Sequence, residues 1–211
     1  MHNASFRWIA AIAALLSLSG EVRAQEASPA TEPVAPATTT VILQTTLGEV
    51  RVALETERAP ITSANFLKYV DEKRLDGTTI YRAVKIGDDG IYGLVQGGVQ
   101  GDRKRTLPPI AHESPAVTGV GHVDGTISMA RGDPGSATAD FFFVLGDLRS
   151  LDGSPANNDP GYAAFGHVTA GLDVVRAVLD LPRSETADQE VMKGQMLAQP
   201  VKIVTVRRAE P

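Results

Sequence analysis

Hydrophobic and polar residues alternate in short runs along most of this chain, which is the pattern of half-buried β-strands. In residues 49–54, every second side chain is aliphatic, and the positions between them are mainly polar. A β-type run over residues 41–46 precedes this one, and Leu47-Gly48 supplies a turn between the two. The pattern predicts an antiparallel N-terminal hairpin with one buried face.

Further β-type runs follow along the chain. They occupy residues 78–84, 94–98, 125–131, 140–145, 162–166 and 201–206. Strict alternation in the first of them places Ile80, Arg82 and Val84 on one face. An arginine between two aliphatic neighbours is unusual and calls for a reason. The last run is well placed to pair with the N-terminal hairpin.

Helical periodicity is convincing in only two segments. Residues 60–74 carry one amphipathic pattern, with Pro60 at the start and Thr62 or Ser63 as candidate caps. Residues 172–179 carry the second, with leucine and valine recurring at intervals of three and four.

Many short strands and two separated helices predict a mainly β fold. We expect a closed antiparallel barrel capped by the two helices, because closure leaves no exposed sheet edge. A β-sandwich is the alternative. The length of 211 residues suits one packed domain, for which we take residues 41–211.

The N-terminus has the features of a secretory signal peptide. A short basic region precedes an apolar run over residues 8–18, and Val22-Arg23-Ala24 predicts cleavage after Ala24. The alternative is an uncleaved membrane anchor. Residues 25–40 are rich in Ala, Pro and Thr and are expected to be a disordered linker. The mature chain is therefore expected in the periplasm or outside the cell, without stable membrane insertion.

Composition removes several classes of chemistry. The net charge of −5 argues against nucleic acid as a partner, and the absence of cysteine removes disulfides and thiolate nucleophiles. His112, His122 and His167 lack metal-ligand spacing, and no serine lies in a GxSxG turn. We expect no metal and no cofactor.

A site built from one arginine, one glutamine and apolar residues can still stabilise a changing dipole. Rotation about the bond before proline is opposed by amide resonance, with a barrier of about 18–20 kcal/mol. Twisting the bond gives the imide nitrogen a lone pair, which a guanidinium binds more strongly than it binds the planar amide. Prolyl isomerisation therefore fits these residues, and a hydrolase does not.

Six motifs in order resemble the cyclophilin-type peptidyl-prolyl cis-trans isomerases, in particular their exported bacterial members. They are Tyr81-Arg82-Ala83-Val84, Val95-Gln96-Gly97-Gly98, residues 125–131 (GTISMAR), residues 140–143 (DFFF), Leu151-Asp152-Gly153 and Phe165-Gly166-His167-Val168. The resemblance covers the chain from about Val41 to its end. It implies an eight-stranded antiparallel barrel capped by two helices, and proline-containing polypeptides as substrates of a monomer.

The resemblance also implies site residues. Arg82 falls on the catalytic arginine, and Gln96 falls on the glutamine that places it. The implied substrate-binding residues are Leu94, Ala130, Arg131, Phe142, Leu151 and Tyr162. Because alternate strand residues share a face, Phe142 can line the proline pocket while Phe141 and Phe143 pack behind it.

Three residues depart from the family pattern. Gly93 stands where a pocket phenylalanine is expected, Ser150 stands where many relatives have tryptophan, and Asp140 replaces a glutamine. Asp140 is expected to pair with Arg82 or Arg131. These departures leave a second hypothesis open, a non-catalytic proline-peptide-binding module or holdase chaperone on the same fold.

Overall fold

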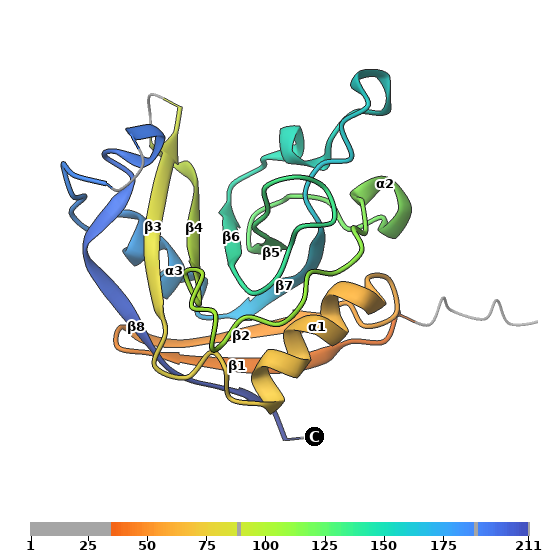
Figure 1. Ribbon diagram of the computed structural model, residues 1–211, viewed down its shortest axis with the longest axis horizontal. Coiled ribbons are helices and arrows are strands. Elements are labelled where there is room, and N and C mark those ends of the chain that lie inside the picture. The colour runs from red at the N-terminus through yellow and green to blue at the C-terminus, as the bar shows by residue number, and fades with distance from the viewer. Residues whose placement is uncertain (1–34, 88–89, 188–189, 211) are drawn as a thin grey trace, which may run out of the picture. The chain divides into compact units, whose positions relative to one another are not determined.

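The chain folds into a closed β-barrel in a computed structural model that describes residues 35–87, 90–187 and 190–210. Its strands are β1 (Thr39–Thr45), β2 (Gly48–Leu54), β3 (Thr79–Ile86), β4 (Tyr92–Gly98), β5 (Thr126–Met129), β6 (Phe141–Leu145), β7 (Ala164–Ala170) and β8 (Met196–Arg208). Antiparallel pairs join them in the order β1-β2-β7-β5-β6-β4-β3-β8, and β8 closes on β1 (Figure 1). The predicted eight-stranded barrel is confirmed.

Two helices cover the barrel, as predicted. Helix α1 (Pro60–Asp71) packs against β7 and β8, and helix α3 (Leu172–Leu179) packs against β2, β3 and β4. A single helical turn, α2 (Pro115–Thr118), lies in the long connection before β5. Short 3₁₀ turns occupy Arg149–Asp152, Pro155–Asn157 and Glu190–Met192.

The barrel interior holds the main core, and α1 seals it with an aromatic side chain. The Phe66 ring lies 5.5 Å from Phe141 and 5.3 Å from Phe165, measured between centroids. All three rings are at most 1% exposed. A second and smaller apolar group, centred on Phe142 and Val144, is separate from this core.

A β-bulge in β3 corrects the face predicted for Arg82. In the register of β3 and β4, Ile80 pairs with Gly97 and Arg82 pairs with Gln96. Tyr81 is therefore an extra residue that has no backbone pairing partner in β4. The extra residue reverses the alternation, which a simple pattern cannot anticipate. Ile80 and Ala83 therefore point into the core. Arg82 does not share the face of Ile80, and it is free to face outward.

The cap of α1 also differs from the prediction. Neither Thr62 nor Ser63 caps the helix, and the N-cap residue Ala59 makes no side-chain bond. The Glu113 carboxylate instead accepts hydrogen bonds from the backbone N–H of Ile61 (3.1 Å) and of Thr62 (2.7 Å). It also accepts one from the Thr62 hydroxyl at 2.6 Å. A residue about 50 positions away in sequence thus caps the helix N-terminus in place of a local side chain.

The folded part begins earlier than the predicted boundary at Val41. Strand β1 starts at Thr39, and the Ala37 N–H donates to Glu57 at 2.7 Å. The predicted signal peptide and most of the predicted linker fall in residues 1–34, outside the described residues. None of the described helices is long and apolar enough to cross a membrane.

Candidate active site

Two glutamines hold the guanidinium of Arg82. Its Nη1 donates to Gln96 Oε1 at 2.8 Å, while Nε and Nη2 both donate to Gln195 Oε1, at 2.9 and 2.5 Å. Gln96 is 8% exposed, and its own Nε2 donates to the Tyr81 hydroxyl at 2.7 Å. The bulge residue Tyr81 therefore supports the glutamine that supports the arginine.

The charge of Arg82 is not neutralised by these contacts. Both partners offer neutral amide oxygens, and within residues 35–87, 90–187 and 190–210 no carboxylate pairs with Arg82. Burial lowers the pKa of Arg82 from its usual value. A guanidinium has five N–H donors, of which these bonds use three. A positive group with two unused donors is thus available to a bound molecule.

The strand register aligns Arg82 with the aromatic part of the site. Arg82 pairs with Gln96 across β3 and β4, Gln96 pairs with Phe142 across β4 and β6, and Phe142 pairs with Ser128 across β6 and β5. Cross-strand partners share a face, so these side chains form one row on the outside of the barrel. At about 4.8 Å per strand, the backbones of Arg82 and Phe142 lie about 10 Å apart.

An apolar surface surrounds Phe142 on this face. We call it the outer cluster: Phe142, Val144 and Leu148 with the partly buried Leu94, Ala130, Leu151 and Tyr162. Phe141 and Phe143 point into the main core instead, as the strand alternation predicts. The structure therefore brings five of the six predicted substrate-binding residues into one cluster.

Arg131, the sixth, lies at the edge of the outer cluster. Its guanidinium carbon is 4.7 Å from the centre of the Tyr162 ring, and its Nη2 donates to the Gly161 carbonyl at 2.6 Å. The Tyr162 ring in turn meets Phe142 edge-on, with centroids 5.5 Å apart. Arg131 thus fixes the aromatic wall from outside.

A buried histidine stacks against Phe142, and no sequence motif marks this contact. The rings of His122 and Phe142 stack with centroids 6.1 Å apart, and His122 is 0% exposed. His122 Nδ1 lies 2.7 Å from Asp152 Oδ1, and Nε2 lies 2.9 Å from Ser128 Oγ. A carboxylate accepts only, so Nδ1 donates to Asp152 and Nε2 accepts from Ser128. Burial lowers the pKa of His122, which keeps the ring neutral.

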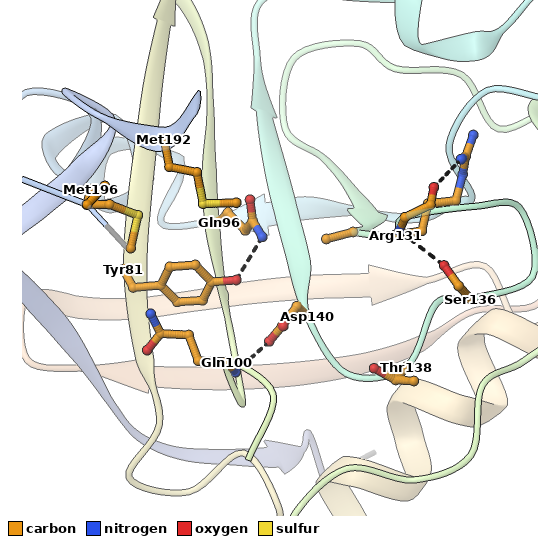
Figure 2. A pocket seen from close by; sticks show the side chains of 12 residues that line it. Tyr81, Gln96, Gln100, Arg131, Ser136, Thr138, Asp140, Met192 and Met196 are labelled. Atoms are coloured by element: carbon orange, nitrogen blue, oxygen red, sulfur yellow. Dashed lines mark hydrogen bonds between the residues drawn. The ribbon is translucent and has the colours of Figure 1, made fainter. Parts of the chain in front are cut away.

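A cavity of about 420 Å³ adjoins this row (Figure 2). Tyr81 and Gln96 form one side, and Arg131 and Ser136 lie opposite. Met192 of the last 3₁₀ turn and Met196, the first residue of β8, lie on the same side as Tyr81. Ala130 lines the cavity and also packs against the outer cluster, so the two are adjacent.

The three departures from the family pattern are not members of the outer cluster, although Asp140 lines the cavity and Ser150 lies on the same 3₁₀ turn as Leu151. Asp140 makes no ion pair with either arginine among the described residues; it accepts the Gln100 N–H at 3.0 Å instead. Burial raises its pKa. A side chain at Gly93 would collide with the Val84 carbonyl oxygen and meet Leu179 of α3 at 2.9 Å, so this position has no room for the phenylalanine of the family pattern. Ser150 is exposed on the 3₁₀ turn.

The described residues contain no group of three or more His, Cys, Asp or Glu side chains that could hold a metal ion.

Comparisons with known proteins agree with the geometry. The family model for cyclophilin type peptidyl-prolyl cis-trans isomerases matches residues 40–208. A peptidyl-prolyl cis-trans isomerase of Acinetobacter baylyi is 35% identical over 175 residues, covering 81% of this chain and 86% of that protein. Isomerase A of Dickeya dadantii is 34% identical and covers 95% and 98%. One from Streptomyces antibioticus is 39% identical and covers 78% and 98%.

A solved structure supports the fold. A cyclophilin type isomerase of Cryptosporidium parvum, crystallised in the presence of the dipeptide Ala-Pro, superposes with a TM-score of 0.65 at 18% identity. The match covers 82% of this chain and 99% of that one.

Proposed function

This chain belongs to the cyclophilin-type peptidyl-prolyl cis-trans isomerases, and we propose that it performs this reaction at Arg82, Gln96 and the outer cluster. It is an isomerase that accelerates rotation about Xaa-Pro bonds. The observation that carries the site is the single row of Arg82, Gln96 and Phe142 on one outer face.

The outer cluster suits the proline ring. Phe142 offers an apolar face with Tyr162 standing edge-on beside it, and Leu94 and Leu151 complete the surface. Burying the ring there anchors one side of the Xaa-Pro bond. The other side can then rotate while the ring stays in place.

Arg82 supplies the differential binding. In the planar amide the proline nitrogen shares its electron pair with the carbonyl and is a poor acceptor. In the twisted amide the pair is localised on nitrogen, and the unused N–H groups of Arg82 can donate to it. Two neutral acceptors fix the guanidinium beforehand, so little reorganisation is needed when the bond twists.

A titration with a short Xaa-Pro peptide tests the assignment of the binding surface. We expect the largest changes of backbone and methyl NMR shifts at Leu94, Ala130, Phe142, Leu151 and Tyr162. Strand β1 is distant from the outer cluster in the strand order and should not respond, so Ile42 on that strand serves as the control. Changes centred away from the outer cluster would contradict the assignment.

We also propose that the protein is exported and acts on the folding of other exported proteins as a monomer. The apolar run and small-x-small pattern of residues 8–24 support export.

Expression of the full chain in a bacterium, followed by fractionation and mass spectrometry, should find a chain beginning at Gln25 in the periplasm or medium. A cytoplasmic chain that keeps Met1 would contradict export. Sedimentation equilibrium should give a mass below the 22.3 kDa of the full chain.

A further inference from the structure

The side-chain amide of Gln195 accepts hydrogen bonds from the Nε and Nη2 groups of Arg82, whereas Gln96 accepts from Nη1. The Gln195 Oε1 atom accepts from Nε and Nη2 together, so two of the three bonds that hold the guanidinium end on this one atom. Gln195 lies just before β8, 113 residues from Arg82 in sequence. We infer that Gln195 is a positioning residue for isomerisation, acting through Arg82; this rests on the role proposed for Arg82.

The orientation of the Gln195 amide follows from its partners. Its Nε2 donates to the Val191 carbonyl at 3.1 Å, and a carbonyl can only accept. Arginine can only donate, so the oxygen must face Arg82. If the amide were rotated by 180°, its NH₂ group would face the N–H donors of Arg82, and its oxygen would face the Val191 carbonyl oxygen. The acceptor therefore points at Arg82 in one orientation only.

The backbone of Gln195 is fixed to the strand that carries Arg82. Its carbonyl accepts the Ala83 N–H at 2.9 Å, and the next residue, Met196, pairs with Arg82 in the register of β3 and β8. Arg183 anchors the same place, because its Nε donates to the Ala83 carbonyl at 2.8 Å. The acceptor is thus held at a constant distance from the guanidinium it binds.

This arrangement orients Arg82 without neutralising it. A carboxylate at this place would grip the same two N–H groups, but it would also cancel part of the charge that the twisted amide must attract. A neutral amide gives direction alone. The Nη1 and Nη2 groups each keep one unused N–H, and these are the donors available to the substrate.

The test uses Gln195→Met, which keeps the length of the side chain and removes the acceptor. Gln199→Met, on the exposed part of β8, is the matched control. We expect Gln195→Met to lower kcat on a short Xaa-Pro peptide at least about tenfold, the size of effect that loss of alignment produces. KM and the melting temperature should match the control. The Nε–H resonance of Arg82 should move or broaden.

Two further variants separate positioning from a structural role. Gln195→Glu restores an acceptor for Nε and Nη2, so it should retain more kcat than Gln195→Met. On an Arg82→Ala background, Gln195→Met should cause no further loss, because a residue that acts through Arg82 has nothing left to position.

The outcomes discriminate between the two proposals. Wild-type kcat in Gln195→Met, or an equal further loss on the Arg82→Ala background, would overturn the inference while leaving Arg82 as assigned. Wild-type activity in Arg82→Ala itself would overturn the proposed role of Arg82 and this inference with it.

Discussion

Glu113 caps helix α1 from outside the helix, and its removal should destabilise the domain. The carboxylate accepts from two backbone N–H groups of the first turn and from the Thr62 hydroxyl. Thr62 is 0% exposed, so Glu113→Ala leaves a buried hydroxyl and a buried N–H without this partner. Loss of a cap costs about 1 kcal/mol, and a buried unsatisfied polar group costs about 1–3 kcal/mol.

The expected loss in the free energy of unfolding is therefore about 2–4 kcal/mol for Glu113→Ala. With an unfolding entropy of about 2.1 cal/mol/K for each of roughly 170 residues, the melting temperature should fall by about 6–11 °C. Glu113→Gln keeps one acceptor oxygen and loses the charge at the helix N-terminus, so it should cost only about 1 kcal/mol.

Urea and thermal unfolding would measure these changes. The control is Glu49→Ala, because Glu49 forms an exposed ion pair with Arg51, and this substitution should cost less than about 0.5 kcal/mol. Isomerase activity at 25 °C should be unchanged in all three variants, since Glu113 does not touch the outer face. A Glu113→Ala protein no less stable than the Glu49→Ala control would refute the capping role.

Other predictions concern the site and its surroundings. Burial lowers the pKa of His122, so the unfolded chain takes up a proton first as the pH falls below about 6.5. Stability should then decline with a slope of at most about 1.4 kcal/mol per pH unit, and urea unfolding of His122→Gln between pH 5 and 8 should lack this contribution. Burial raises the pKa of Asp140 in the folded protein above that in the unfolded chain. The protonated Asp140 side chain therefore contributes to stability at low pH, and this contribution is lost as the pH rises through the raised pKa of the folded state. Asp140→Asn should remove this loss, and a variant whose stability varies with pH like the wild type would contradict the assignment. Phe142→Ala should weaken binding of an Xaa-Pro peptide by about 10- to 100-fold, because the CH₂ groups of the bound proline ring would lose the aromatic surface that buries them, and unchanged affinity by NMR titration would place the proline elsewhere.

Local patterns were enough to predict the barrel. The alternation in β2 and the periodicity of α3 appear in the structure at the positions expected, because each buries one face against the same core. Phe142 was separated from Phe141 and Phe143 by the same argument. The resemblance to a known family supplied the roles of these residues, which periodicity alone could not.

Long-range contacts and local irregularities could not be predicted. The bulge at Tyr81 depends on pairing with β4 and reverses the face of Arg82. Gln195 and Glu113 act on residues far away in sequence, and no local signal marks either one. The sequence spacing of His122 bears only on metal binding, whereas the fold brings Asp152 and Ser128 to it as hydrogen-bond partners.

The most direct test of the account is the cis-to-trans rate of a short Xaa-Pro peptide with the wild type and the Arg82→Ala variant. We expect clear acceleration by the wild type. We expect this acceleration to be lost in the Arg82→Ala variant, which should still fold and still bind the peptide at the outer cluster. An Arg82→Ala variant that accelerates the peptide as the wild type does would contradict the claim that this guanidinium stabilises the twisted bond.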